Sequence, residues 1–220
     1  MHFDKDVWGS RATLRDYKVP TRRPHFEDRT GDRWEPIQHL ALANAVRKAV
    51  ILRKRSPSEE RYALARNGHA VLGCFALAGR APIHVFWRHS NDGFWALAMA
   101  TGIECDGEIL WGPMADAAKH AAGGDLADLA QRAWRNATEV PSPYDIAENL
   151  RSRPIEPWHI LGMAQASCYP WRMVRLVWEQ FDGAQNALDL YRAVHRAGAK
   201  RSPVEQFETL QATRAYLEKA

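Results

Sequence analysis

The alternation of apolar and polar side chains is clearest in the middle of the chain. Residues 69–78 form a short apolar run, and residues 83–88 switch regularly between the two kinds of side chain. Two turn sequences follow, Asn91-Asp92-Gly93 and Asp106-Gly107, which are typical of β-hairpins. They bound two further strand patterns, at residues 94–103 and 108–111. The pattern predicts an antiparallel meander of three or four strands.

Helical spacing flanks this meander. Apolar residues recur every three or four positions over residues 36–52, which predicts a helix that begins at a proline. Ser56 is a suitable cap for a second helix over residues 57–67, which would end at Asn67-Gly68. The alanine-rich residues 116–136 predict a third helix. Because a small sheet needs a covering layer, we expect helices over one of its faces.

The last third of the chain has an all-helical pattern. Ser142-Pro143 predicts the start of a short helix. We expect four more helices, at residues 157–166, 170–181, 184–197 and 202–219. The predicted fold class is therefore α+β: an antiparallel meander of three or four strands covered by helices, then an all-helical C-terminal bundle. The predicted domains are residues 36–140 and residues 141–220.

Residues 1–35 differ from both domains, because they mix charges and contain few aliphatic side chains. Such a segment buries little apolar surface by itself, and we expect an extended anchoring arm. Trp8 and Trp34 are large aromatic residues in this polar context. They are candidate anchors into a partner's pocket or onto a nucleobase, or equally into the arm's own domain.

Composition adds limits on class and compartment. The chain has 220 residues, with 46% hydrophobic and 25% charged side chains, which is an ordinary globular mixture. The first ten residues contain no apolar signal region, and the longest apolar run, residues 70–78, is too short to span a membrane. The cysteines, Cys74, Cys105 and Cys168, are too widely spaced for a metal knot or a disulfide framework. We expect a cytoplasmic protein with no membrane partner.

No catalytic motif is evident. Glu104, Asp106 and Glu108 would share a face on one strand and could bind a divalent cation. Asp106-Gly107 favours a turn instead, which places Glu104 and Glu108 on opposite strands. The histidines are scattered, and neither phosphate loops nor nucleophile motifs occur. We therefore predict no catalytic residues, no metal site and no cofactor.

Basic residues are concentrated at one place. Residues 47–66 hold seven lysines and arginines against two glutamates. Such a patch neutralises phosphates and makes binding dependent on salt concentration. The alternative is a solvated helix end whose cations complement the helix dipole. The candidate nucleic-acid-binding residues here are Arg47, Lys48, Arg53, Lys54, Arg55 and Arg61.

Residues 158–181 predict two short helices joined by a tight turn, as in a helix-turn-helix. On the second helix we expect Arg172 and Arg175 to face outward as further nucleic-acid-binding residues. We expect the apolar side chains Trp171, Val174 and Trp178 to face inward. The alternative is an ordinary helical corner.

These features favour a non-catalytic, nucleic-acid-associated subunit of a larger bacterial protein–nucleic-acid assembly, of the defence or mobile-element type. Nucleic acid would be contacted through its backbone, and protein subunits would be further partners. Two other classes remain open from sequence. One is a phosphodiester-acting hydrolase or nuclease with a dispersed site, and the other is a protein-binding inhibitor or immunity factor that uses the acidic residues 101–145.

Overall fold

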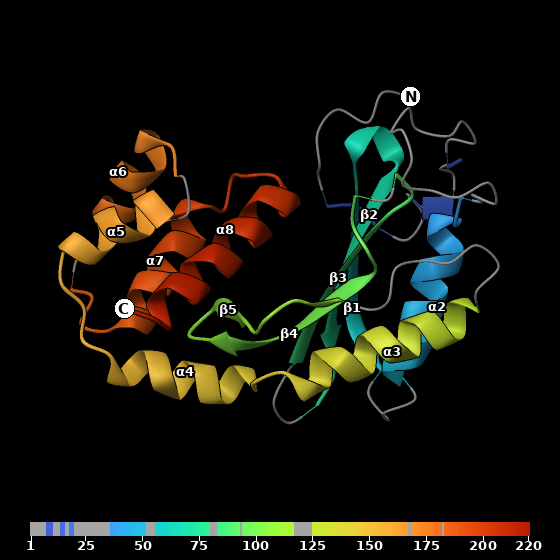
Figure 1. Ribbon diagram of the computed structural model, residues 1–220, viewed down its shortest axis with the longest axis horizontal. Helices are drawn as coiled ribbons and strands as arrows, with labels where there is room; N and C mark the ends of the chain where they lie inside the picture. The colour runs from blue at the N-terminus through green and yellow to red at the C-terminus, as the bar shows by residue number, and fades with distance from the viewer. Residues whose placement is uncertain are drawn as a thin grey trace. The chain divides into compact units, whose positions relative to one another are not determined.

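A computed structural model gives the structure of the chain (Figure 1). It describes residues 8–10, 14–15, 18–19, 36–51, 56–79, 83–92, 94–116, 125–166, 169–181 and 183–220. The chain divides into two compact units. The first comprises residues 1–101 and 114–140, and the second comprises residues 102–113 and 141–220. The second unit thus contains a β-hairpin in addition to the C-terminal helices.

The sheet is an antiparallel meander. Its strands follow in the order β1-β2-β3-β4-β5, and the short strand β6 pairs with β4. The α+β class and the meander predicted from sequence are confirmed, although the sheet has more strands than predicted. The strands are β1 (Pro57–Ala65), β2 (Ala70–Leu77), β3 (Ile83–Ser90), β4 (Ala98–Cys105), β5 (Glu108–Trp111) and β6 (Ala115–Asp116).

Two helices cover one face of the first unit's strands, α2 (His39–Ile51) and α3 (Leu126–Glu139) (Figure 1). Each buries a stripe of residues three or four positions apart, the spacing expected of an amphipathic helix. Asp125 caps α3 by accepting a hydrogen bond of 2.8 Å from the Ala127 N–H. The stripes pack onto a common core, which includes Leu42, Val46, Val50, Ala130, Ala133, Val71, Phe75, Val85 and Trp87.

The predicted helix over residues 57–67 is wrong, since Pro57–Ala65 form strand β1. Their backbone pairs with β2, from Pro57 opposite Leu77 to Ala65 opposite Ala70. The strand also buries Tyr62, whose ring lies 5.9 Å from that of Phe75 between centroids. The ladder and this buried ring outweigh the local capping signal at Ser56.

Gly73 lets the Trp87 ring lie closer to the backbone of β2 than a residue with a side chain would allow. It lies opposite Trp87 in the β2–β3 register, and the Trp87 ring is fully buried. A Cβ atom at position 73 would lie 2.1 Å from Trp87 Nε1. The indole therefore occupies the space that any other side chain at position 73 would need.

The second unit holds five helices: α4 (Pro143–Ser152), α5 (Trp158–Ala166), α6 (Trp171–Glu179), α7 (Ala187–Ala197) and α8 (Pro203–Leu217). Ser142 caps α4 with Pro143 in its first turn, as the sequence predicts. A capping box of Ser202 and Glu205 begins α8. Among the described helices of both units, none combines the length and apolarity needed to cross a lipid bilayer.

Helix α7 lies at the centre of the second unit and packs against α4, α6, α8 and β5. Its Tyr191 is fully buried, and the Tyr191 hydroxyl accepts a hydrogen bond of 3.2 Å from the Trp111 N–H. Trp111 in turn packs its ring on Phe207 of α8, with centroids 5.5 Å apart. The hairpin turns at Asp106 and Gly107, where φ is 49° and 86°, as the turn sequence predicts. These contacts explain why the hairpin belongs with the helices.

Enlarging Gly73 should destabilise the first unit. Gly73→Ala places a methyl group on the buried Trp87 ring, and we expect it to lower the free energy of unfolding by about 1–3 kcal/mol. Trp87→Leu removes the ring, so the loss in the double variant should be smaller than the sum of the two single losses. Equilibrium unfolding in urea measures all three, and additive losses would contradict the proposed packing of Trp87 on Gly73.

Candidate functional site

The basic residues predicted to bind nucleic acid lie around the end of α2 and the start of β1. Of these, Arg53, Lys54 and Arg55 lie outside the described residues. Arg47 forms an ion pair of 2.5 Å with Glu60, and Arg61 forms one of 2.6 Å with Glu59. The two arginines are thus locally neutralised by carboxylates of β1.

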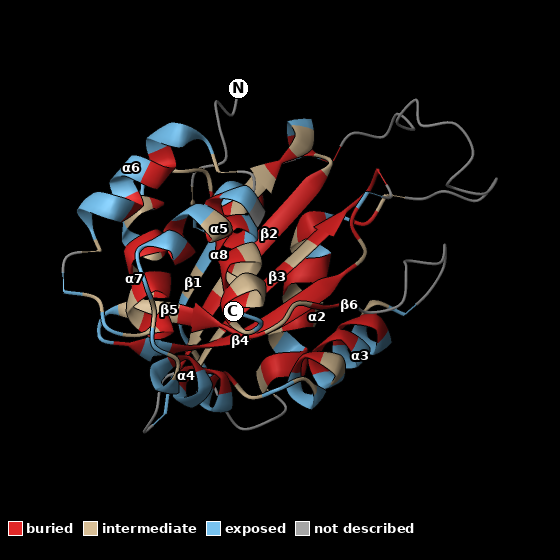
Figure 2. Ribbon diagram, turned by 60° about the vertical axis from the view of Figure 1, so that its left-hand side comes forward, coloured by how far each residue is buried: buried red, intermediate tan, exposed pale blue. Residues whose placement is uncertain are grey.

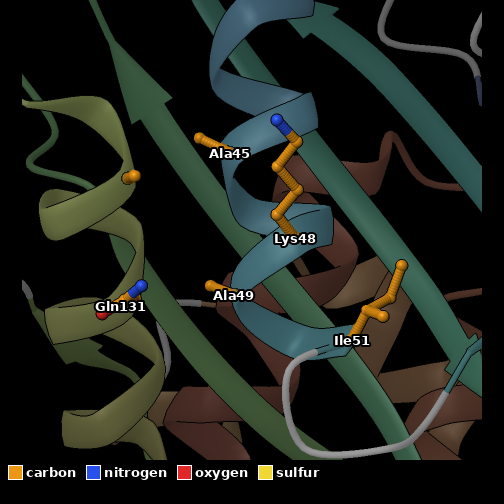
Figure 3. Close-up of a pocket in the computed structure, with 6 residues that line it drawn as sticks. Ala45, Lys48, Ala49, Ile51 and Gln131 are labelled. Atoms are coloured by element: carbon orange, nitrogen blue, oxygen red, sulfur yellow. The ribbon is translucent and has the colours of Figure 1, made fainter.

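Lys48 differs from these arginines. It is exposed in the last turn of α2, and within the described part of the chain no ion pair involves it. It borders a groove of about 280 Å³ between α2 and α3 that is otherwise lined by apolar side chains and Gln131 (Figure 3). The groove exists because alanines occupy the facing positions, Ala45 and Ala49 on α2 and Ala127 on α3. It is smaller than the roughly 300–1,000 Å³ of small-molecule sites.

Charge is divided unequally between the two units. Of the 30 lysines and arginines, the first unit holds 20 and the second 10, while the 26 aspartates and glutamates divide 14 to 12. The excess lies within residues 36–101, which contain nine cations and only three acids, Glu59, Glu60 and Asp92. Each of these acids is ion-paired with an arginine of the same stretch.

The third of these ion pairs, between Arg66 and Asp92, belongs to a group of polar side chains at the β1–β2 and β3–β4 turns, the polar corner, which no sequence motif indicates. Arg66 Nε donates a hydrogen bond of 2.5 Å to Asp92 Oδ2, and the Arg66 guanidinium lies 4.0 Å from the centre of the exposed Phe94 ring. Burial of the Asp92 carboxylate alone would raise its pKa. Hydrogen bonds from Ser90, Arg66 and the Phe94 N–H outweigh burial, so the pKa of Asp92 lies below its usual value.

The same corner fixes the start of α2. The Asn91 side chain accepts a hydrogen bond of 2.8 Å from the Ile37 N–H and donates one of 3.0 Å to the Ile37 carbonyl. His39 donates from Nε2 to the Gly68 carbonyl at 2.8 Å. Burial lowers the pKa of His39 despite this bond, so the imidazole is neutral at neutral pH. Asn91 was visible in the sequence only as a turn residue, since its partner Ile37 lies 54 positions away.

This turn also carries backbone strain. Arg66 and Asn67 both have φ of 54°, a left-handed conformation that glycine tolerates best. The ion pair to Asp92 holds the Arg66 side chain on the neighbouring turn. The corner is therefore a structural clamp between the β1–β2 and β3–β4 connections, and Arg66 is committed to it.

On α6 the structure exposes Arg172 and Arg175, as predicted. Arg175 forms an ion pair of 2.9 Å with Glu179, one turn further along the same helix. The predicted inward orientation of the two tryptophans is wrong: Trp171 is 75% exposed and Trp178 is 53% exposed. The buried side chains of α6 are Met173, Val174 and Val177.

The N-terminal arm contacts its own unit at the described positions. Trp8 is half-buried, with its ring edge-on to Phe86 of β3 at 6.4 Å between centroids. Gly9 and Tyr62 exchange two backbone hydrogen bonds, of 2.6 and 2.8 Å. Leu14 is buried in the core of the first unit. Trp34 lies outside the described residues.

The carboxylates of the hairpin and two of the cysteines have defined surroundings in the described part of the chain. Glu104 and Glu108 lie on opposite strands of the hairpin, and no group of three His, Cys, Asp or Glu side chains is placed to hold a metal ion. Burial raises the pKa of the Cys74 thiol to about 12 and also raises the pKa of Cys105. Neither thiol is a ready nucleophile, since the thiolate is the reactive form.

The clearest titratable pair of the second unit is His195 and Glu108, which are joined by a hydrogen bond at Nδ1 of the imidazole. Burial lowers the pKa of His195 and outweighs the opposing effect of Glu108, with Arg196 lowering it further. The imidazole is thus neutral at neutral pH and donates to the carboxylate. The pair fastens α7 to the hairpin, as does Arg192 through Asp106 at 3.3 Å.

Comparisons with known proteins give no relative: neither a protein-family model, nor a curated protein, nor a solved structure matches this chain.

The polar corner should contribute measurably to stability. Asp92→Ala leaves the Arg66 guanidinium without its carboxylate, and we expect a loss of about 1.5–3 kcal/mol in the free energy of unfolding. Asp92→Asn keeps the shape and some of the hydrogen bonds, so its loss should be smaller. Urea unfolding measures the free energy of unfolding of both variants. An Asp92→Ala variant as stable as the wild type would show that the polar corner does not stabilise the fold.

His195 should make the second unit less stable in acid. The folded state holds the His195 pKa below its usual value of 6.5, so folding favours the neutral imidazole. Its contribution is complete above that value and is lost as the pH falls through the lowered pKa. His195→Gln should remove this part of the pH dependence. Unfolding curves at a series of pH values compare the two proteins, and parallel profiles would rule out the assignment.

Proposed function

We propose that this protein is a non-catalytic, nucleic-acid-associated subunit that contacts the phosphate backbone through the carboxyl end of α2 and the residues that follow it. The observation that carries the proposal is the pairing of charges in residues 36–101. All three acids of this stretch are held by Arg47, Arg61 and Arg66, and the stretch contains no further acid. Lys48, Arg53, Lys54 and Arg55, the cationic group, are the remaining cations of residues 47–66, and the two glutamates that follow them, Glu59 and Glu60, are already paired with Arg61 and Arg47.

These ion pairs reduce the set of basic residues that we propose as phosphate contacts. Arg47 and Arg61 already have carboxylate partners, so a phosphate would have to compete with Glu60 and Glu59 for them. Lys48 has no such competitor among the described residues, and its ammonium group can approach a phosphate as a point charge. We therefore assign the main backbone contacts to Lys48 and to residues 53–55, and only a minor part to the paired arginines.

The side chains of this cationic group, lysines and arginines, favour binding without sequence preference. Lysine and arginine side chains that meet phosphates position a nucleic acid but do not distinguish its bases. The groove beside Lys48 carries one amide side chain, Gln131, and is otherwise apolar. It offers few donors or acceptors for reading base edges. Binding should therefore depend steeply on salt concentration and weakly on sequence.

Reversing the cationic group should abolish most of the binding. In the triple variant Arg53→Glu, Lys54→Glu and Arg55→Glu, we expect affinity for an oligonucleotide to fall at least about tenfold at low salt. The plot of log affinity against log salt should flatten by about 0.9 for each duplex phosphate that the variant no longer neutralises. Lys48→Glu alone should lower the affinity less but in the same direction. Fluorescence anisotropy with a labelled oligonucleotide measures both quantities.

A matched control separates a local effect from net charge. Arg151, Lys200 and Lys219 are exposed in the second unit, and reversing all three changes the net charge by the same amount. The proposal requires this control to retain most of the affinity and the salt slope. Equal losses in the two triple variants, or no loss in either, would contradict the assigned site. Far-ultraviolet circular dichroism confirms that each variant is folded.

A further inference from the structure

Helices α5 and α6 expose an unusual amount of apolar surface. The two helices follow each other in the chain and pack together within the second unit. Soluble monomers rarely leave several large apolar side chains exposed together, and such patches commonly mark interaction sites. The exposed residues are Trp158 at 61%, Leu161 at 52%, Trp171 at 75%, Leu176 at 36% and Trp178 at 53%.

The tryptophans of α6 form a row. Trp171 and Trp178 are seven residues apart, so they lie on the same side of the helix about two turns, or roughly 10.5 Å, apart. Arg175 lies one turn from each of them. The adjoining side of α6 supplies the core through Met173, Val174 and Val177, while both tryptophans remain mostly exposed. The second unit therefore packs without burying these two tryptophans. Figure 2 shows the exposed side of α6.

The composition of this surface favours a protein occupant over a nucleic acid. The second unit has 10 cations against 12 acids, so it does not attract a polyanion at long range. Leu161 and Leu176 offer neither charge nor a ring on which a base could stack. Tryptophan and arginine, by contrast, are the residues enriched at the energetic centres of protein interfaces.

We infer that the α5–α6 surface is an interface between two copies of this chain. Turning one α6 antiparallel to another places Trp171 of each copy opposite Trp178 of the other, and it brings the two Arg175 side chains, each paired with Glu179 of its own helix, near each other at the centre. Arg172 then approaches Glu179 of the second copy. Two-fold pairing of identical surfaces is the commonest form of protein oligomer.

The exposed apolar area supplies a substantial part of what such a dimer needs. Taking about 150–250 Å² for a whole aromatic side chain, the three tryptophans expose roughly 280–470 Å² at these exposed fractions. Each partner in a standard interface buries about 800 Å². The indoles alone thus supply about half of one face, and Leu161, Leu176 and the two arginines extend it.

Sedimentation velocity of the full chain over a wide range of concentration tests the inference. The wild type should sediment as a dimer at the upper end of the range. Trp171→Asp combined with Trp178→Asp should weaken dimerisation at least about thirtyfold, the loss expected for hot-spot side chains. Tyr144→Asp is the matched control, because Tyr144 is 45% exposed on α4, at the opposite end of the second unit from α6 (Figures 1 and 2). It should leave the dimer intact, and unchanged thermal melting shows that all variants fold.

A cross-linking experiment tests the antiparallel arrangement. In a Cys168→Ser background, chains carrying Trp171→Cys and chains carrying Trp178→Cys are mixed and oxidised. The proposed two-fold axis predicts disulfides between the two kinds of chain, and few between chains of the same kind. Preferential linkage between identical chains would overturn the arrangement.

Three further results would overturn the inference itself: a monomer at every concentration, a dimer insensitive to the double tryptophan variant, or oligonucleotide binding by a monomer that this variant abolishes. The first two leave the phosphate contacts proposed for α2 untouched, whereas the third would also contradict those contacts. The two proposals can therefore fail separately.

Discussion

The packing of Trp87 onto Gly73 is the contact on which the first unit depends. The indole fills the space above the glycine and lies 6.3 Å from the Tyr62 ring between centroids. Because Tyr62 must point into this core, residues 57–65 form a strand even though Ser56 and Pro57 begin them like a helix. Helix α2 then rests on the same aromatic cluster, and its last turn holds Lys48 outside the core.

The arrangement of the strands also determines which charged side chains form ion pairs. The strand β1 brings Glu59 and Glu60 to the arginines Arg61 and Arg47, while the β3–β4 turn brings Asp92 to Arg66. The few acidic residues near the basic stretch thus form ion pairs with arginines of that same stretch. The second unit uses its charges in a similar way, since Arg192 and His195 of α7 bind carboxylates of the hairpin. What distinguishes the two units is the excess of cations that remains in the first.

Much of the fold was predictable from local patterns, and two of the failures share one cause. Asp106-Gly107 and Ser142-Pro143 specify their structures through turn and capping chemistry, and both predictions are confirmed. The strand at residues 57–65 and the pairing of Arg47 with Glu60 depend on partners distant in sequence, so neither followed from pattern. The exposure of Trp171 was open to prediction: Met173, Val174 and Val177 already form an apolar stripe at helical spacing that leaves both tryptophans at its edge.

The central claim, that phosphates meet the chain at the carboxyl end of α2, is tested most directly by photochemical cross-linking. The intact protein is irradiated with a bound oligonucleotide, and the cross-linked peptides are identified by mass spectrometry. The account predicts adducts concentrated within residues 46–56, which include Lys48, Arg53, Lys54 and Arg55. Adducts confined to residues 158–179, or spread evenly over the chain, would contradict it.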